Sequence, residues 1–228
     1  MSAAVCAAGL LVACGPPASA PPASPDQISA PPTTPAPAAA SPEARAAWTS
    51  YTTADGDLTF DLPRTWTIKD PAGELPEGGG VFVEVSNEAG KPMATLRTNM
   101  ATGSTCTERY PYSVLHSQPL AALAQGGETP RFVFETRGDP SAAEPSHTTV
   151  AGYGIVTAQE PTGDTACPLF HFFRWPPSAA MFGAFYNPES NATPGDPSAP
   201  YLEKAKLYAG TQEFQDILRM ITSLRPAG

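Results

Sequence analysis

The feature that most constrains the fold is a proline-rich segment near the start of the chain. Residues 15 to about 46 are almost wholly Pro, Ala, Ser and Thr, and ten of the 28 prolines lie between Pro16 and Pro42. Proline fixes φ and has no amide hydrogen to donate, so this segment can form neither a helix nor a sheet ladder. We expect a disordered, semi-rigid tether that extends about 3 Å per residue, up to roughly 100 Å in all. The alternative, a low-complexity tail without a spacing role, predicts the same disorder.

A short apolar stretch precedes the tether and ends in Leu11-Val12-Ala13-Cys14-Gly15. This run resembles the lipobox of bacterial lipoproteins, in which the cysteine is acylated and becomes the first residue of the mature chain. The resemblance implies that residues 1–14 are a signal peptide and that Cys14 carries the lipid. The protein would then be anchored by lipid at the extracytoplasmic face of the cell membrane. The alternative is a buried cysteine in an ordinary apolar segment.

The remaining residues, 47–228, have the length of one domain and can bury a hydrophobic core. The formal net charge of the chain is −9, and its 13 Lys and Arg residues are scattered singly along the sequence. A nucleic-acid-binding protein needs a concentrated basic surface, so the sequence excludes that class. The negative charge also argues against electrostatic docking on an anionic bilayer.

Two further cysteines, Cys106 and Cys167, lie in this domain. An exported protein experiences oxidising surroundings, where an even number of cysteines predicts a disulfide. The alternatives are a metal site and a thiol nucleophile. Neither cysteine belongs to a C-x-x-C pair, so the pattern favours the disulfide. Closing a loop of about 60 residues stabilises a fold by roughly 4 kcal/mol in the chain-entropy model.

Much of the domain has the apolar alternation of β-strands. Residues 48–53 and 58–62 flank an Asp55-Gly56 step, which predicts a hairpin because Asp-Gly supplies the positive φ of a tight turn. Residues 81–85 and 93–98 predict a second hairpin. Further strands are predicted at residues 131–137, 148–157, 169–175 and 180–186.

Three details refine this pattern. Gly152 and Gly154 flank Tyr153 and indicate a bulge or a close backbone approach. Residues 170–173 are apolar on both faces, which is typical of a central strand covered on both sides. Residues 187–200 are rich in Pro, Ser, Asn and Gly and predict a surface loop.

The clearest helix comes last in the chain. Five apolar residues fall on one stripe at helical spacing: Phe214, Ile217, Leu218, Ile221 and Leu224. Thr211 is a suitable N-cap, and the acidic residues lie early and the arginines late, in agreement with the helix macrodipole. We predict that this stripe packs across a sheet.

Two segments resemble the PsbP-like family of exported proteins. The run LTFDLPRTW, residues 58–66, looks like the family's opening strand, proline turn and following tryptophan. The run FQDILRMITSLR, residues 214–225, is similar to its closing helix. The resemblance implies an α+β fold, an α/β/α sandwich around an antiparallel sheet. It also implies binding and adaptor roles more than catalysis, with no universal active site.

The sequence contains few motifs for catalysis. His116, His147 and His171 form no ligand pair, and neither a G-x-S-x-G nor an S-x-x-K motif occurs. His171 lies in the aromatic strand and is expected to be a buried core histidine. The sequence does not exclude a glycosidase-like pair of catalytic carboxylates, because 22 Asp and Glu residues are present. We assign no catalytic residue, no metal site and no cofactor.

Two functions remain. The first is a non-catalytic envelope lipoprotein whose domain binds an envelope protein, a glycan or a small ligand, with Trp175, Phe182 and Tyr186 as the possible binding surface. The second is an extracellular enzyme that acts on cell-wall or secreted material through carboxylates and His171. A deep cleft with two converging acids, or His171 beside an acid, favours the enzyme, whereas a shallow aromatic surface favours the binder. We predict a binding protein.

Overall fold

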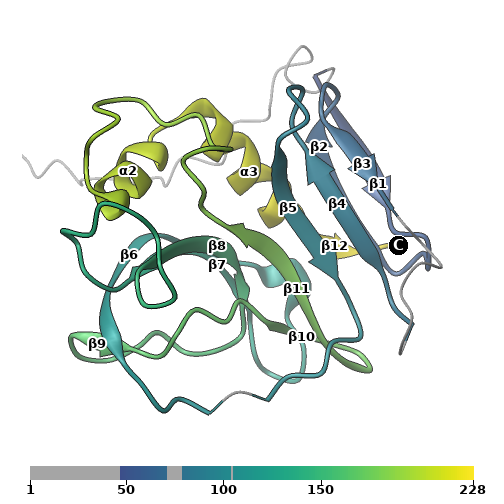
Figure 1. Cartoon of the computed structure of the whole chain (residues 1–228). Helices are drawn as coiled ribbons and strands as arrows, with labels where there is room; N and C mark the ends of the chain where they lie inside the picture. Colours follow the sequence, from purple (N-terminus) through teal and green to yellow (C-terminus); the bar gives the residue numbers. More distant parts are fainter. Residues whose placement is uncertain (1–46, 71–78, 104) are drawn as a thin grey trace, which may run out of the picture. The chain divides into compact units, whose positions relative to one another are not determined.

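A computed structural model describes residues 47–70, 79–103 and 105–228 (Figure 1). The strands are β1 (Trp48–Thr52), β2 (Leu58–Pro63), β3 (Thr67–Lys69), β4 (Phe82–Ser86), β5 (Pro92–Arg97), β6 (Tyr110–Pro119), β7 (Arg131–Arg137), β8 (Val150–Val156), β9 (Thr165–Ala166), β10 (Phe173–Trp175), β11 (Ser178–Phe185) and β12 (Arg225–Pro226). The helices are α2 (Tyr201–Tyr208), α3 (Gln212–Thr222) and the short 3-10 turn η1 (Ala121–Leu123). The fold class of this part is mixed α+β, mostly antiparallel sheet with two α-helices.

Both hairpins predicted from the sequence are present. β1 pairs antiparallel with β2, and Gly56 in the turn has a φ of 80°, a conformation that favours glycine. β4 pairs antiparallel with β5. The side-chain oxygen of Asn87 closes the turn between them by accepting hydrogen bonds from the amides of Ala89 and Lys91. Strands β7, β8 and β11 also form where they were predicted, within two residues at each end.

The strands form two sheets in which neighbouring strands run antiparallel. The larger sheet has the order β3-β4-β5-β11-β8-β7-β6-β9, with β10 attached to β11 outside this path. The smaller sheet has the order β1-β2-β12. Helices α2 and α3 lie together on one face of the larger sheet (Figure 1), which we call the inner face. The opposite face of the larger sheet is the outer face.

The inner face carries the hydrophobic core, and α3 packs on it as predicted. The Phe214 ring centroid lies 5.0 Å from that of Phe134 and 6.4 Å from that of Tyr153. Ile217 and Ile221 are buried beside it. The Thr211 side chain caps the helix by accepting a hydrogen bond from the Phe214 amide. The predicted stripe is confirmed, except that Leu218 is only partly buried and Leu224 is buried just beyond the end of the helix.

The prediction of a central strand at residues 169–175 was wrong. Only Phe173–Trp175 forms a strand, the short β10, while residues 167–172 cross the outer face without strand structure. We call residues 167–172 the strap. The place of a central strand is already taken, because β8 and β11 pair directly through Gly154 and Gly183. A segment that lies on top of a sheet can also carry apolar side chains on both of its sides. The sequence pattern therefore did not distinguish a strap from a central strand.

Candidate functional site

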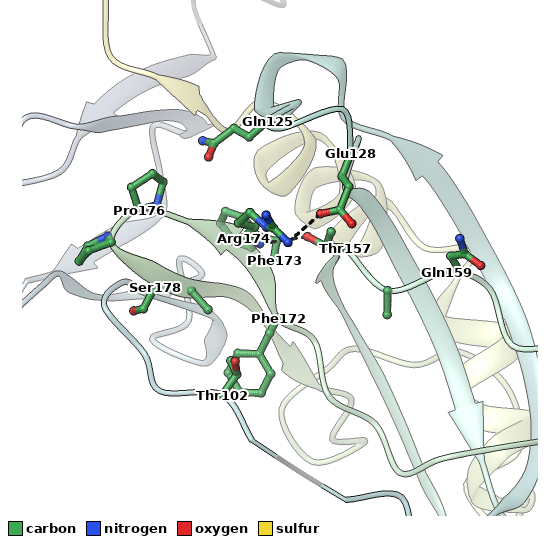
Figure 2. A pocket seen from close by; sticks show the side chains of 13 residues that line it. Thr102, Gln125, Glu128, Thr157, Gln159, Phe172, Phe173, Arg174, Pro176 and Ser178 are labelled. Atoms are coloured by element: carbon green, nitrogen blue, oxygen red, sulfur yellow. Dashed lines mark hydrogen bonds and ion pairs between the residues drawn. The ribbon is translucent and has the colours of Figure 1, made fainter.

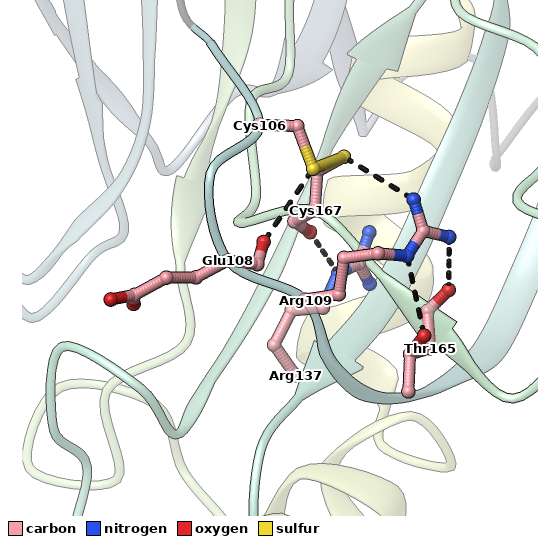
Figure 3. Close-up of a disulfide and its surroundings, with 6 residues drawn as sticks. All are labelled: Cys106, Glu108, Arg109, Arg137, Thr165 and Cys167. Atoms are coloured by element: carbon pink, nitrogen blue, oxygen red, sulfur yellow. Dashed lines mark hydrogen bonds between the residues drawn. A yellow bond between two sulfur atoms is a disulfide. The ribbon is translucent and has the colours of Figure 1, made fainter.

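The predicted site residues fall in three places. Cys14 lies outside the described residues. Cys106 and Cys167 are joined as a disulfide that fixes the start of the strap (Figure 3). The third group, the predicted binding surface, is considered next.

The aromatic surface predicted from Trp175, Phe182 and Tyr186 does not exist, because all three side chains are buried. Phe182 points to the inner face of β11, and its ring centroid lies 5.0 Å from that of Phe60 in the smaller sheet. The Tyr186 ring packs against the tyrosines of α2. Strand alternation therefore exposes a different aromatic residue of β11, Phe185, on the outer face.

The two glycines of β8 allow the strap to lie against the sheet. A Cβ atom added to Gly154 would lie 2.9 Å from the Cβ of His171, and one added to Gly152 would lie 3.2 Å from a methyl carbon of Leu169. Real Cβ atoms essentially never approach to 2.9 Å, so a larger residue than glycine at position 154 would push the strap away. The close backbone approach predicted from these glycines is confirmed.

Beneath the strap lies a buried charged network. His171 Nε2 lies 3.2 Å from Glu135 Oε1, and Arg137 Nη1 donates to Glu135 Oε2 at 3.1 Å. Arg137 Nε also donates to the backbone oxygen of Cys167 at 2.6 Å. The side chains of Glu135, Arg137 and His171 are only 6–9% exposed. The network therefore links strand β7 to the strap at two points.

The electrostatics of the network favour an ionised Glu135. Burial raises the pKa of the carboxyl group, but the hydrogen bond from His171 and the charge of Arg137 together outweigh burial. The pKa of Glu135 consequently lies below its ordinary value of 4.5. A carboxylate held ionised beside the Arg137 guanidinium, with His171 within hydrogen-bond distance, is suited to holding the strap in place.

The outer face has an apolar hollow of about 270 Å³ between the strap and β11. Its lining consists of Leu169, Phe170, His171, Phe172, Met181, Gly183, Ala184 and Phe185, and we call it the phenylalanine groove. Phe170 is 46% exposed and Phe185 is 63% exposed. Exposed apolar patches of this kind mark interaction sites more often than single scattered hydrophobic residues do.

A second hollow, of about 490 Å³, lies on the other side of Phe170. It runs between the strap and residues 158–162, with the outer face of β7 contributing to it. Arg109, Arg131 and Arg137 line it, together with Glu135 and Glu160, and we call it the arginine trough. Phe170 lines both hollows, so the groove and the trough adjoin at this side chain.

No protein-family model, curated protein or solved structure matches this chain. The functional argument therefore depends on the geometry of the outer face. Within the described residues, no helix is long and apolar enough to cross a membrane. In the same part of the chain, no cluster of three or more His, Cys, Asp or Glu side chains could hold a metal ion.

A third hollow, of about 700 Å³, lies beside the turn between β10 and β11 (Figure 2). Its two charged side chains already neutralise each other, because Arg174 Nη2 lies 3.2 Å from Glu128 Oε2. Both side chains are at least half exposed to solvent. We assign less weight to this hollow because it offers neither an enclosed apolar surface nor an unpaired charge.

No local sequence pattern marked the aromatic residues of the groove or the arginines of the trough. Phe170 was predicted to lie in a covered strand. Phe185 and Phe182 lie on opposite faces of β11, and both faces of that strand are apolar, so the sequence does not show which of the two is exposed. The three arginines are separated by 22 and 6 positions in the sequence and line one hollow only because β6 pairs with β7.

Proposed function

We propose that this protein is an envelope lipoprotein with a tethered, non-catalytic binding domain, and that its partner docks on the phenylalanine groove. The lipobox-like run and the proline-rich segment support the anchored location. A cysteine pair at disulfide distance fits an oxidising compartment. The likeness of residues 58–66 and 214–225 to the PsbP-like family supports a binding role.

The observation that carries the proposal is the exposure of Phe170 and Phe185 on the rim of one hollow. Aromatic side chains that lose contact with water on binding contribute most of the affinity at many interfaces. The strap that presents Phe170 is held by the disulfide and by the Glu135 network, so little ordering is needed when a partner binds. The groove has few polar groups, which disfavours a glycan as its main occupant.

Removal of the two aromatic rings tests the binding site. The double variant Phe170→Ser, Phe185→Ser should recover at least about tenfold less partner than the unchanged protein, since each anchor contributes about 2 kcal/mol or more. The measurement is crosslinking in the envelope of the producing organism, followed by mass spectrometry with the full chain as bait. Leu207→Ser is the matched control, because Leu207 is similarly exposed but lies on α2.

Equal recovery of the same partner by the double variant would contradict the proposed site. An empty capture by the unchanged protein would instead point to a small ligand or to an enzyme.

Replacement of the proposed lipidation site tests the location. Cys14→Ser should move the protein from the membrane fraction to the soluble fraction, because a serine hydroxyl cannot form the thioether to the lipid. The measurement is cell fractionation followed by immunoblotting. Cys6→Ser is the matched control, because Val5 before it is β-branched where a lipobox needs a small residue. Unchanged membrane association of Cys14→Ser would rule out the anchor.

The alternative function is an extracellular enzyme that acts on cell-wall or secreted material. The observation that favours it is His171 beside Glu135, since a histidine next to a carboxylate can act in acid–base catalysis. Glu135 is, however, also paired with Arg137. Among the described residues, no hydroxyl or thiol that could act as a nucleophile contacts the His171 ring. Binding therefore stays the proposal.

A further inference from the structure

We infer that the arginine trough binds an extended acidic segment of a partner polypeptide whose apolar side chain enters the phenylalanine groove. This inference depends on the proposed binding function and adds the chemistry of the partner. It is carried by the positions of three arginines, by the donors that two of them leave available, and by Phe170 between the two hollows.

The trough has positive groups near both ends. Arg131 and Arg137 lie on the same face of β7, six residues apart, which corresponds to about 20 Å along a strand. Arg109 is beside Arg137, because both contact Cys167: Arg137 through the backbone oxygen and Arg109 through the sulfur at 3.9 Å (Figure 3). A ligand that neutralises both ends must therefore be elongated.

Arg109 is positioned to accept a new carboxylate. Its Nε and Nη2 donate to the side chain and the backbone oxygen of Thr165, at 3.3 and 2.6 Å. The guanidinium group is thus held in place, while its nearest partner at Nη1 is a weakly accepting sulfur. In the described chain, no carboxylate lies within 4.0 Å of Arg109. A preorganised planar guanidinium suits bidentate binding of a carboxylate.

Arg131 at the other end is incompletely paired. Its Nη1 atom is buried and has no hydrogen-bond partner within the described residues. The nearest carboxylate oxygen, Glu160 Oε1, is 3.6 Å away and belongs to a side chain that is 61% exposed. A partner carboxylate could replace Glu160, which can move into solvent. Arg137 contributes less, because Glu135 already neutralises it.

The charge of the whole chain makes this pairing selective. With a net charge of −9, the protein repels acidic segments over most of its surface and attracts them where arginines gather. Separated positive ends favour a polymer with several carboxylates over a single phosphate group. Because Phe170 lines both hollows, one extended segment can place its acids in the trough and an apolar side chain in the groove.

A synthetic peptide tests this inference with the full chain. The probe has seven residues with capped ends, glutamate first and last, phenylalanine in the centre and alanine elsewhere, so that its glutamates are about 20 Å apart when extended. The matched peptide has glutamine in place of both glutamates. We expect the acidic peptide to bind about tenfold more tightly in NMR titrations, and the difference to shrink at high salt.

Arginine variants identify the subsite. Arg109→Gln and Arg131→Gln should each weaken binding of the acidic peptide about threefold, which is about 0.6 kcal/mol per pair. Arg97→Gln is the matched control, since Arg97 lies over Phe82 and does not line the trough. Arg109 is exposed, so this variant remains informative even if replacement of the partly buried Arg131 disturbs folding.

Each other outcome overturns the inference. If both peptides bound equally well and only Phe170→Ser weakened their binding, the groove would still be a binding site. The inference of an acidic partner would then be wrong. Competition by inorganic phosphate at the concentration of the peptide would identify a phosphate site instead. If neither peptide bound, the inference that the trough and the groove bind an extended acidic segment would be wrong. The capture experiment with the Phe170 and Phe185 variants tests the proposed function separately.

Discussion

Replacing Glu135 with glutamine is expected to lower the free energy of unfolding by about 3–5 kcal/mol, because it leaves Arg137 buried without its counter-charge. The Arg137 side chain is 6% exposed and contacts Glu135 at 3.1 Å. Urea unfolding monitored by fluorescence measures the effect. Glu84→Gln is the matched control, since Glu84 pairs with Lys69 at a solvent-exposed position and should change stability by less than about 1 kcal/mol. Equal stability of the two variants would contradict the structural role of the network.

The same substitution should alter the dependence of stability on pH. The pKa of Glu135 in the folded chain lies below the ordinary value of 4.5, so folding favours the ionised carboxylate. This contribution is fully present above the unfolded pKa and is lost as the pH falls through the folded pKa. Below a pH of about 4.5, the unchanged protein should therefore lose stability more steeply than Glu135→Gln. Parallel pH profiles of the two proteins would show that Glu135 is not the responsible group.

The second large effect is expected from removal of the disulfide. The double variant Cys106→Ser, Cys167→Ser should be about 4 kcal/mol less stable, because the disulfide closes a long loop and so limits the conformations of the unfolded chain. The two cysteines are 61 positions apart. Thermal and urea unfolding of the oxidised protein and the double variant measure this difference.

A reducing agent supplies the control for that experiment. Reduction should destabilise the unchanged protein to a similar extent and leave the double variant unaffected. If the oxidised protein and the variant unfolded at the same urea concentration, the disulfide would not stabilise the fold. The strap should also loosen in the variant, because Cys167 is its first residue and also accepts the hydrogen bond from Arg137.

Several elements followed from local chemistry and were predicted correctly. The Asp55-Gly56 step specified a hairpin because few residues adopt the positive φ found at Gly56. Thr211 specified the start of α3 because its hydroxyl satisfies an amide that the helix leaves free. The apolar stripe of α3 specified a buried face. Such signals depend on residues a few positions apart, so a single sequence contains them.

Other elements were missed or misplaced. Helix α2 and strand β6 were not predicted, because α2 has a weak apolar stripe and the burial of β6 does not alternate strictly. The strap was predicted as a strand. Its apolar side chains pack on the outer face of the sheet, where Gly152 and Gly154 leave room for the strap to lie on top of β8.

The amino-acid sequence alone determined where the hairpins and the last helix form and which two cysteines pair. Those outcomes depend on backbone restrictions, short-range periodicity and the count of thiols. Only the tertiary structure decided that Phe170 and Phe185 face solvent while Phe182 is buried, and that Arg109 and Arg131 line one trough. The reason is physical: exposure and charge clustering depend on which strands become neighbours and which face is covered, and those contacts join residues that are distant in the chain.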